Sequence, residues 1–247
     1  MKLRNPLRSL SALAVSAVVS GALLIAPVAA HATSRAVAHD SSIPVPAGYT
    51  LLASPIGTIA GYLAPGKKKV RNVSPSYNGS PLTMPVIAQS QGYLQVRLPM
   101  RPNGQTTWVK VANVSTTATA YRIVINLKTT HLSVYYKNVR TFNFPVGVGS
   151  VADPTPIGNF FVAFFASPPD PGYGPFVMVT TAHSNTITDW EQSGDAMIAI
   201  HGPIGADAQI GTKGARISHG CIRMHVPNQR HMQNIPTGTP IQILPYH

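Results

Sequence analysis

One cysteine and two histidines lie close together near the carboxyl end of the chain. Cys221 is the only cysteine among 247 residues and lies two positions after His219 in the stretch RISHGCIRM, residues 216–224. A second imidazole, His201, ends the apolar run AMIAI twenty positions earlier. A thiol attacks carbonyl carbons as its thiolate, and imidazole is a common acceptor for its proton. The pattern therefore predicts nucleophilic thiol chemistry.

The segment between the two groups must bring them together. It contains Gly205, Gly211 and Gly214, and glycine permits the backbone conformations of tight turns and close approach. We expect this loop to fold His201 back over Cys221.

Residues next to the cysteine suit acyl transfer. Gly220 lets the chain present backbone N–H groups to a developing oxyanion without a side chain in the way. Arg216 and Arg223 add positive charge, which is expected to lower the thiol pKa.

Other kinds of site remain open. Zinc could be held by Cys221 and histidines, although no CxxC or HExxH spacing is present. The cysteine could be a buried, inert side chain, but such residues usually lie in apolar strands. Ser218 does not fit the G-x-S-x-G pattern of a hydrolase, because Arg216 stands where the first glycine belongs. Paired carboxylates for glycoside hydrolysis are disfavoured because acids are scarce. The zinc alternative would use His201, His219, Cys221 and either His225 or His231.

The first part of the chain has the layout of a secretory signal. Basic residues precede an apolar run from Leu10 to Ile25, and small residues follow it. That run is shorter than the ~20 residues of a spanning helix. We expect residues 1–32 to be removed after Ala30 or Ala32, leaving an exported protein with no integral membrane segment.

Composition favours short strands over helices. The chain has 20 glycines and 23 prolines, and helical periodicity is nearly absent. The pattern predicts a mostly β protein with a small basic β domain over residues 33–118, including a linker near 115–120, and a catalytic domain over 119–247. Trp108 and Tyr93 are expected to be core aromatics of the first domain.

Alternation in the second half predicts a sheet. Ile123 and Ile125 are expected on one face of a strand, and Leu132 and Val134 on one face of the next strand. A turn between the two strands is expected at 128–130. The only helix expected is a short one at 227–235, with proline in its first turn.

The first half carries most of the positive charge. Residues 33–118 have eight Lys or Arg and one acid, whereas 119–247 have eight and six. A basic cluster beside Pro65-Gly66 is expected to be an exposed loop that attracts an anionic polymer, or a solvated face kept for solubility. No nucleic-acid-binding motif is present, so nucleic acid is not an expected partner. The cluster consists of Lys67, Lys68, Lys69 and Arg71.

The residues around the cysteine resemble the L,D-transpeptidase catalytic domain (YkuD-like) family. Its signature is a His, a gap of about 14–17 residues, then Ser/Thr-His-Gly-Cys, a hydrophobic residue, and Asn or Arg. Here sixteen residues separate His201 from SHGCIR, which begins at Ser218. The stretch FPVGVGSVADPTPIGNFFV and the terminal NIPTGTPIQIL also resemble family segments, so the resemblance covers residues 121–244. The first domain resembles, more weakly, the SH3-like modules that precede such domains.

The resemblance implies a β-sandwich catalytic domain that cross-links peptidoglycan without a metal or other cofactor. Cys221 would attack a donor tetrapeptide and release D-Ala, and an acceptor amine of a second stem peptide would resolve the thioester. A carbapenem is expected to acylate the same cysteine. Hydrolysis by water would instead make an L,D-carboxypeptidase, and a non-catalytic wall-binding module is a further alternative.

The same resemblance implies roles for individual residues. His201 would be the base, oriented by the Gly202 carbonyl, and His219 would position the thiolate. The amides of Gly220 and Cys221 would be oxyanion donors. Ser218, Arg223 and Tyr173 would contact substrate, although Arg223 could equally form a structural ion pair and Tyr173 could be a buried aromatic. The sequence departs from the family at Val226, where Asn is common, and at Pro203, where Thr is frequent.

Overall fold

The computed structural model describes residues 42–212 and 214–246, which fall within one compact unit, Ala38–His247. The predicted signal segment therefore lies outside the described residues. None of the helices among the described residues is long and apolar enough to cross a membrane.

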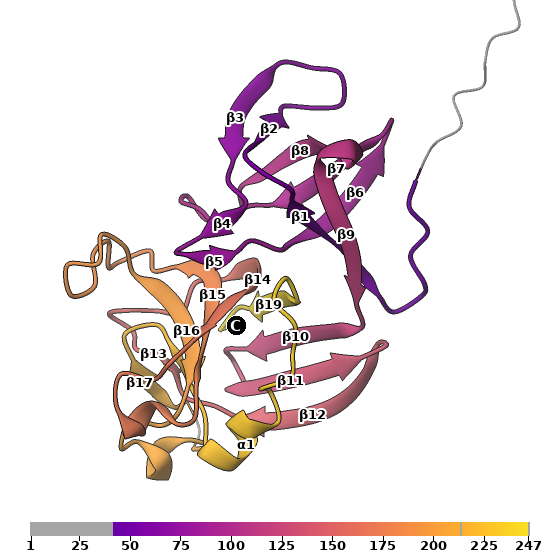
Figure 1. Cartoon of the computed structure of the whole chain (residues 1–247). Helices are drawn as coiled ribbons and strands as arrows, with labels where there is room; N and C mark the ends of the chain where they lie inside the picture. Colours follow the sequence, from indigo (N-terminus) through magenta and orange to yellow (C-terminus); the bar gives the residue numbers. More distant parts are fainter. Residues whose placement is uncertain (1–41, 213, 247) are drawn as a thin grey trace, which may run out of the picture. The chain divides into compact units, whose positions relative to one another are not determined.

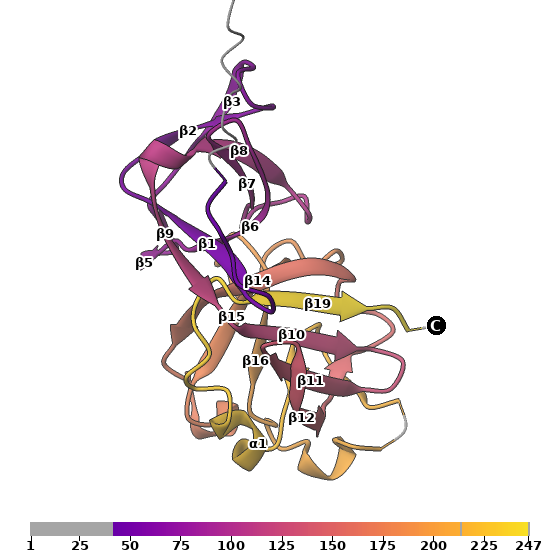
Figure 2. The ribbon, with the colours of Figure 1, turned by 90° about the vertical axis from the view of Figure 1, so that its right-hand side faces the viewer.

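The mostly β class is confirmed (Figures 1 and 2). The first part of the chain supplies β1 (Thr50–Pro55), β2 (Ile59–Tyr62), β3 (Lys69–Val73), β4 (Ser76–Tyr77), β5 (Ser80–Pro81), β6 (Met84–Ser90), β7 (Tyr93–Arg97), β8 (Thr106–Lys110), η1 (Val111–Asn113) and β9 (Val114–Thr119). The second part supplies β10 (Tyr121–Asn126), β11 (His131–Tyr136), β12 (Val139–Pro145), β13 (Val148–Gly149), β14 (Gly158–Ala166), η2 (Pro171–Tyr173), β15 (Val177–His183), β16 (Met197–His201), η3 (Asp207–Gln209), β17 (Arg216–Ser218), β18 (Ile222–Arg223), α1 (Val226–Arg230) and β19 (Pro240–Leu244).

Seven strands form the first sheet, in the order β3-β2-β8-β7-β6-β1-β9. Strand β9 pairs along its length with β1, so the residues predicted as a linker are mostly a strand. Trp108 and Tyr93 are partly exposed and do not belong to the buried core, which corrects that prediction. Their strands alternate, and the buried faces belong to neighbours such as Leu94 and Val109.

The basic cluster is only partly a loop. Lys67 and Lys68 lie between β2 and β3, whereas Lys69 and Arg71 lie on β3 itself. The three lysines are exposed, but the Arg71 guanidinium lies against Met100 and donates to Gln105 Oε1 at 3.3 Å.

Eight strands form the second sheet, in the order β12-β11-β10-β19-β14-β15-β16-β18. The predicted turn is present between β10 and β11, where Ile125 lies opposite Leu132. Strand β19 lies between β10, to which it is parallel, and β14. Buried residues from both halves of this sheet belong to one core cluster, so the sheet folds around its own apolar face.

The expected helix is shorter than predicted. Strand β18 leads into α1, which begins at Val226 and ends at Arg230. Pro227 occupies its first turn as expected, and Gln229 is buried and donates to the Phe176 carbonyl.

Candidate active site

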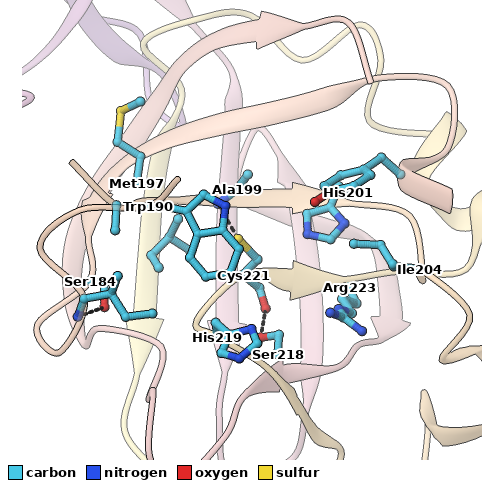
Figure 3. A pocket seen from close by; sticks show the side chains of 14 residues that line it. Ser184, Trp190, Met197, Ala199, His201, Ile204, Ser218, His219, Cys221 and Arg223 are labelled. Carbon is cyan, nitrogen blue, oxygen red and sulfur yellow. Dashed lines mark hydrogen bonds between the residues drawn. The ribbon is translucent and has the colours of Figure 1, made fainter. Parts of the chain in front are cut away.

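Cys221 and His201 come together because their strands are neighbours. Strands β16 and β18 are parallel, with Ile200 beside Ile222, and the Ala199 N–H donates to Cys221 Sγ at 3.4 Å. Successive side chains of a strand point to opposite faces, so His201 shares the face of Ala199. Both the thiol and the imidazole line one pocket (Figure 3).

The His201 ring is fixed in one tautomer. Its Nδ1 lies 2.8 Å from the Gly202 carbonyl oxygen, and a carbonyl can only accept, so Nδ1 carries the hydrogen and Nε2 is left as the basic atom. The Tyr173 ring packs against it with centroids 4.7 Å apart. Burial lowers the His201 pKa to about 4, since the bond to Gly202 offsets only part of that effect and Arg223 adds to it. The imidazole is therefore neutral at pH 7.

Gly202 allows the backbone to approach the Tyr173 turn. Its N–H donates to the Tyr173 carbonyl at 2.7 Å. A Cβ added at this position would lie 2.6 Å from the Tyr173 carbonyl carbon, which is too close for any side chain. The contact between Gly202 and the Tyr173 turn fixes the position of the Gly202 carbonyl, which orients His201.

Hydrogen bonds of the Ser218 hydroxyl stabilise the turn before Cys221. Ser218 is buried, donates its hydroxyl hydrogen to the Cys221 carbonyl at 2.6 Å, and accepts from the Gly220 N–H at 3.1 Å. Gly220 has φ +117° and its added Cβ would meet Ile198 at 2.7 Å, so glycine is required. A substrate contact by Ser218 or oxyanion donation by Gly220 would therefore have to replace these bonds.

Thr155 supports the turn before Cys221 and was not singled out from the sequence. Its hydroxyl donates to the Gly220 carbonyl at 2.8 Å and accepts from the Gly149 N–H at 2.9 Å. It is 1% exposed, so water does not replace these bonds. Its position in the Pro-Thr-Pro stretch was the available signal.

Replacing Thr155 by valine is expected to destabilise the protein by about 2 kcal/mol, because two buried backbone groups lose their partner. Thr155→Ser keeps the hydroxyl and is expected to cost less than about 1 kcal/mol. Urea unfolding of both variants measures the difference. Equal stability of the valine variant and the native protein would contradict the role assigned to the hydroxyl.

His219 lies at the mouth of the pocket. Its side chain is 62% exposed, with Nε2 4.0 Å from an Asp153 carboxylate oxygen and its ring 5.3 Å from the Trp190 ring. Trp190 was not predicted as a site residue, because the loop that carries it has no motif.

The cysteine environment differs from the sequence expectation in one respect. Burial raises the pKa of the Cys221 thiol above its ordinary value, and the Ala199 N–H and Arg223 only partly offset this. Arg216 plays no part, since its guanidinium lies 4.1 Å from the centre of the Tyr246 ring. The resting pair is therefore a protonated thiol and a neutral imidazole.

Arg223 offers a cationic group without a protein anion. Its Nε is buried and has no hydrogen-bond partner, and no ion pair among residues 42–212 and 214–246 includes it. The structural ion pair considered for it is thus not found in the described part of the chain. The backbone of Arg223 exchanges hydrogen bonds with Gly147, which fixes its place in the pocket.

The pocket encloses about 150 Å³. Tyr173 lines it, whereas Phe176 packs on Phe165 and His183 is buried and does not line it. No three His, Cys, Asp or Glu side chains within the described ranges are grouped to hold a metal ion. The lining residues are Tyr173, Ser184, Ile187, Trp190, Ala196, Met197, Ile198, Ala199, His201, Ile204, Ser218, His219, Cys221 and Arg223.

Comparison with known proteins gives consistent matches. The family model of the L,D-transpeptidase catalytic domain (YkuD) matches residues 120–243. A Bacillus licheniformis protein named as an L,D-transpeptidase, YkuD, is 29% identical over 126 residues, which are 51% of this chain and 66% of that protein, just under two thirds of its length.

Two solved structures are similar to this one at low identity. L,D-transpeptidase 3 from Mycobacterium tuberculosis, in complex with a faropenem-derived adduct, has a TM-score of 0.45 and 11% identity, covering 78% of this chain and 95% of that one. An L,D-transpeptidase from Mycobacterium smegmatis has a TM-score of 0.37 and 14% identity, covering 62% and 90%. Because the family model matches residues 120–243, which are half of this chain, the chain belongs to the L,D-transpeptidase catalytic domain family.

Proposed function

We propose that this protein is a peptidoglycan transpeptidase that forms 3-3 cross-links through a thioester on Cys221. The observation that carries the proposal is the pairing of β16 with β18, which presents the thiol and the His201 imidazole to one pocket. The bond from His201 Nδ1 to the Gly202 carbonyl supports it, because it directs the free Nε2 to proton transfer.

Acylation would proceed with His201 as the only proton carrier. Sγ attacks the carbonyl carbon of the L,D peptide bond while its proton passes to Nε2. The C–N bond then breaks, and the leaving amine of D-Ala takes the proton from Nε2. This leaves a thioester and a neutral imidazole.

Deacylation would repeat these steps with the acceptor. The amine of a second stem peptide attacks the thioester carbon and gives its proton to Nε2. The C–S bond breaks, and the proton returns to the sulfur. Water in place of the amine would give a tripeptide, which is the carboxypeptidase alternative.

The Cys221 N–H would stabilise the oxyanion, with the Gly220 N–H joining if it leaves Ser218. His219 at the pocket mouth would position the intermediate. The Tyr173 ring, which packs on His201 and lines the pocket, would contact the substrate.

Arg223 would bind a carboxylate of the stem peptide, because its guanidinium faces the pocket and its buried Nε has no protein partner. Arg223→Ala is expected to raise KM about 10–100-fold with a smaller change in kcat. Arg223→Lys keeps the charge but not the bidentate fork, so it should recover part of the loss. Steady-state kinetics on tetrapeptide substrates measure both, and an unchanged KM in the alanine variant would contradict the role.

Reaction of the mature protein with tetrapeptide muropeptides tests the whole proposal. A product with the mass of a dimer minus D-Ala supports transpeptidation, and a tripeptide alone supports the carboxypeptidase. Absence of either product, together with no acyl adduct on the protein, would contradict the enzymatic function and favour the wall-binding alternative. Exposure to a carbapenem, followed by intact mass measurement, is expected to give one covalent adduct at Cys221.

The proposal includes export and two domains. A wall enzyme must cross the membrane, and residues 1–32 have the composition of a cleaved signal. Residues 33–118 would form a small basic β domain, SH3-like in kind, whose three exposed lysines attract an anionic wall polymer. Mass measurement of the secreted protein should place its first residue at His31 or Thr33.

A further inference from the structure

One wall of the pocket is a long loop between β15 and β16. Residues Ser184, Ile187 and Trp190 of this loop line the pocket that holds Cys221. Trp190 is 41% exposed and lies beside His219, and Figure 3 shows its indole in the same opening as the thiol. The position of this loop therefore decides the shape of the pocket.

A single arginine of the first sheet binds both ends of that loop. Arg101, in the turn between β7 and β8, donates from Nη1 to the Ser184 carbonyl at 2.7 Å and from Nη2 to the Ile187 carbonyl at 3.1 Å. Its Nε donates to Asp195 Oδ1 at 2.9 Å. The guanidinium thus joins the start of the loop to its end, with the planar geometry that only arginine provides.

Asn103, in the same turn, binds the residue before the loop. Its side-chain amide donates to the His183 carbonyl at 2.7 Å, and its oxygen accepts from the His183 N–H at 3.0 Å. Asp195 also faces His183 Nδ1 at 2.7 Å. The turn at 101–103 therefore binds both the last residue of β15 and the first residue of the loop.

The bonds within the loop do not replace these contacts. The Ser184 N–H donates to the Ala196 carbonyl at 2.8 Å and closes the base of the loop, and the Trp190 N–H donates to the Asp195 carbonyl at 3.1 Å. Outside the loop, the Thr186 hydroxyl donates to Asp153 Oδ1 at 3.1 Å. The guanidinium of Arg101 is the group that binds Ser184, Ile187 and Asp195 together. The short β4-β5 hairpin also contacts the adjacent wall, where the Tyr77 hydroxyl donates to Met197 Sδ at 3.1 Å.

We propose that Arg101 and Asn103 are positioning residues for substrate binding, which hold the loop Ser184–Ala196 so that Trp190 forms a wall of the pocket beside Cys221. The proposal rests on the proposed function and deepens it, because it gives the first part of the chain a role at the active site. Neither residue touches the reacting atoms, so both act through the loop.

Arg101→Ala is expected to raise KM for a tetrapeptide substrate about 10-fold and to change kcat by less than about 3-fold, since the wall binds substrate away from the reacting bond. Arg101→Lys keeps the charge but loses the fork, so only part of the loss should be recovered. Arg140→Ala is the matched control, because it removes the same charge from an exposed site on β12 and is expected to leave KM unchanged.

Two further measurements do not depend on turnover. The chain has two tryptophans, so a Trp108→Phe background reports Trp190 alone. In that background, Arg101→Ala is expected to raise acrylamide quenching of Trp190 about 2-fold, as the indole leaves the wall. The alkylation rate of Cys221 by iodoacetamide should stay within about 2-fold, because the thiol and His201 are held by other strands.

The outcomes separate the two proposals. Unchanged quenching in a folded Arg101→Ala variant would overturn the positioning role, whatever the substrate proves to be. Increased quenching without any turnover by the native protein would support the positioning role and contradict the proposed function. If Arg101→Ala does not fold, Asp195→Asn removes the anion from the same contact and is expected to raise quenching in the same direction.

Discussion

Replacing Cys221 with alanine is expected to lower the rate of product formation by at least about 10⁴-fold, to the level of background hydrolysis. No other side chain can accept the acyl group by the same route, because this is the only thiol in the chain. The measurement is the initial rate of D-Ala release from a tetrapeptide muropeptide at pH 7. Intact mass of the protein during turnover should show an acyl adduct in the native protein and none in the variant.

Cys221→Ser separates nucleophilicity from shape. Serine fills nearly the same space but is a far weaker acid than a thiol, and a neutral His201 whose pKa is about 4 is a weak base for it. We therefore expect the serine variant to lose at least about 10³-fold in rate while keeping the fold. Turnover near the native rate in either variant, with native circular dichroism, would contradict thioester chemistry.

That Cys221 and His201 would lie at one site could be predicted because they are separated by only twenty positions in the sequence. The SHGC stretch and the glycine-rich approach to it specify a tight turn, and Gly220 indeed has a positive φ that side chains rarely adopt. What the sequence does not contain is the register of β16 against β18, which places Ala199 rather than another residue beside the sulfur. The raised thiol pKa follows from that burial and not from the count of nearby arginines.

Errors in the first sheet arose from reading residue type before periodicity. The run STTATA predicts a linker, but threonine is favoured in strands and residues 115–119 pair with β1. Trp108 is predicted in the core, yet its neighbours Thr107 and Val109 are the buried residues. In β15 every residue is buried, so alternation of residue type along this strand does not indicate which of its side chains face the pocket.

Contacts between distant segments were beyond sequence reasoning. Arg101 lies 94 positions before Asp195, and neither stands in a recognisable motif. Such pairs depend on how two sheets meet, which is set by the sum of many apolar contacts, including Phe161 of β14 in the core of the first sheet. The wall of the pocket that Trp190 forms is accordingly the part that the sequence does not predict.

Replacing His201 with glutamine is expected to lower kcat/KM about 10³-fold or more, because the amide can neither take the thiol proton nor return it to the leaving amine. The native pH profile should identify the same group. The unprotonated imidazole is the active form, and burial holds its pKa at about 4, so activity is expected to persist on acidification until about pH 4. His219→Gln is the matched variant, since it removes the exposed imidazole of the same pocket and should leave this acid limb in place. Loss of the acid limb in His219→Gln would instead assign the base to His219.

Stability gives an independent check on His201 that needs no substrate. Its folded-state pKa, about 4, is below the ordinary histidine value of 6.5, so the unfolded chain binds the proton more readily than the folded one. The native protein therefore loses stability as pH falls from about 6.5 towards 4, whereas the glutamine variant lacks this contribution. At pH 4.5 the difference between the two proteins should shift by about 2 kcal/mol in favour of the variant, relative to their difference at pH 7.5. Urea unfolding at the two pH values measures it, and a difference that does not depend on pH would mean that the imidazole is not buried in its neutral form.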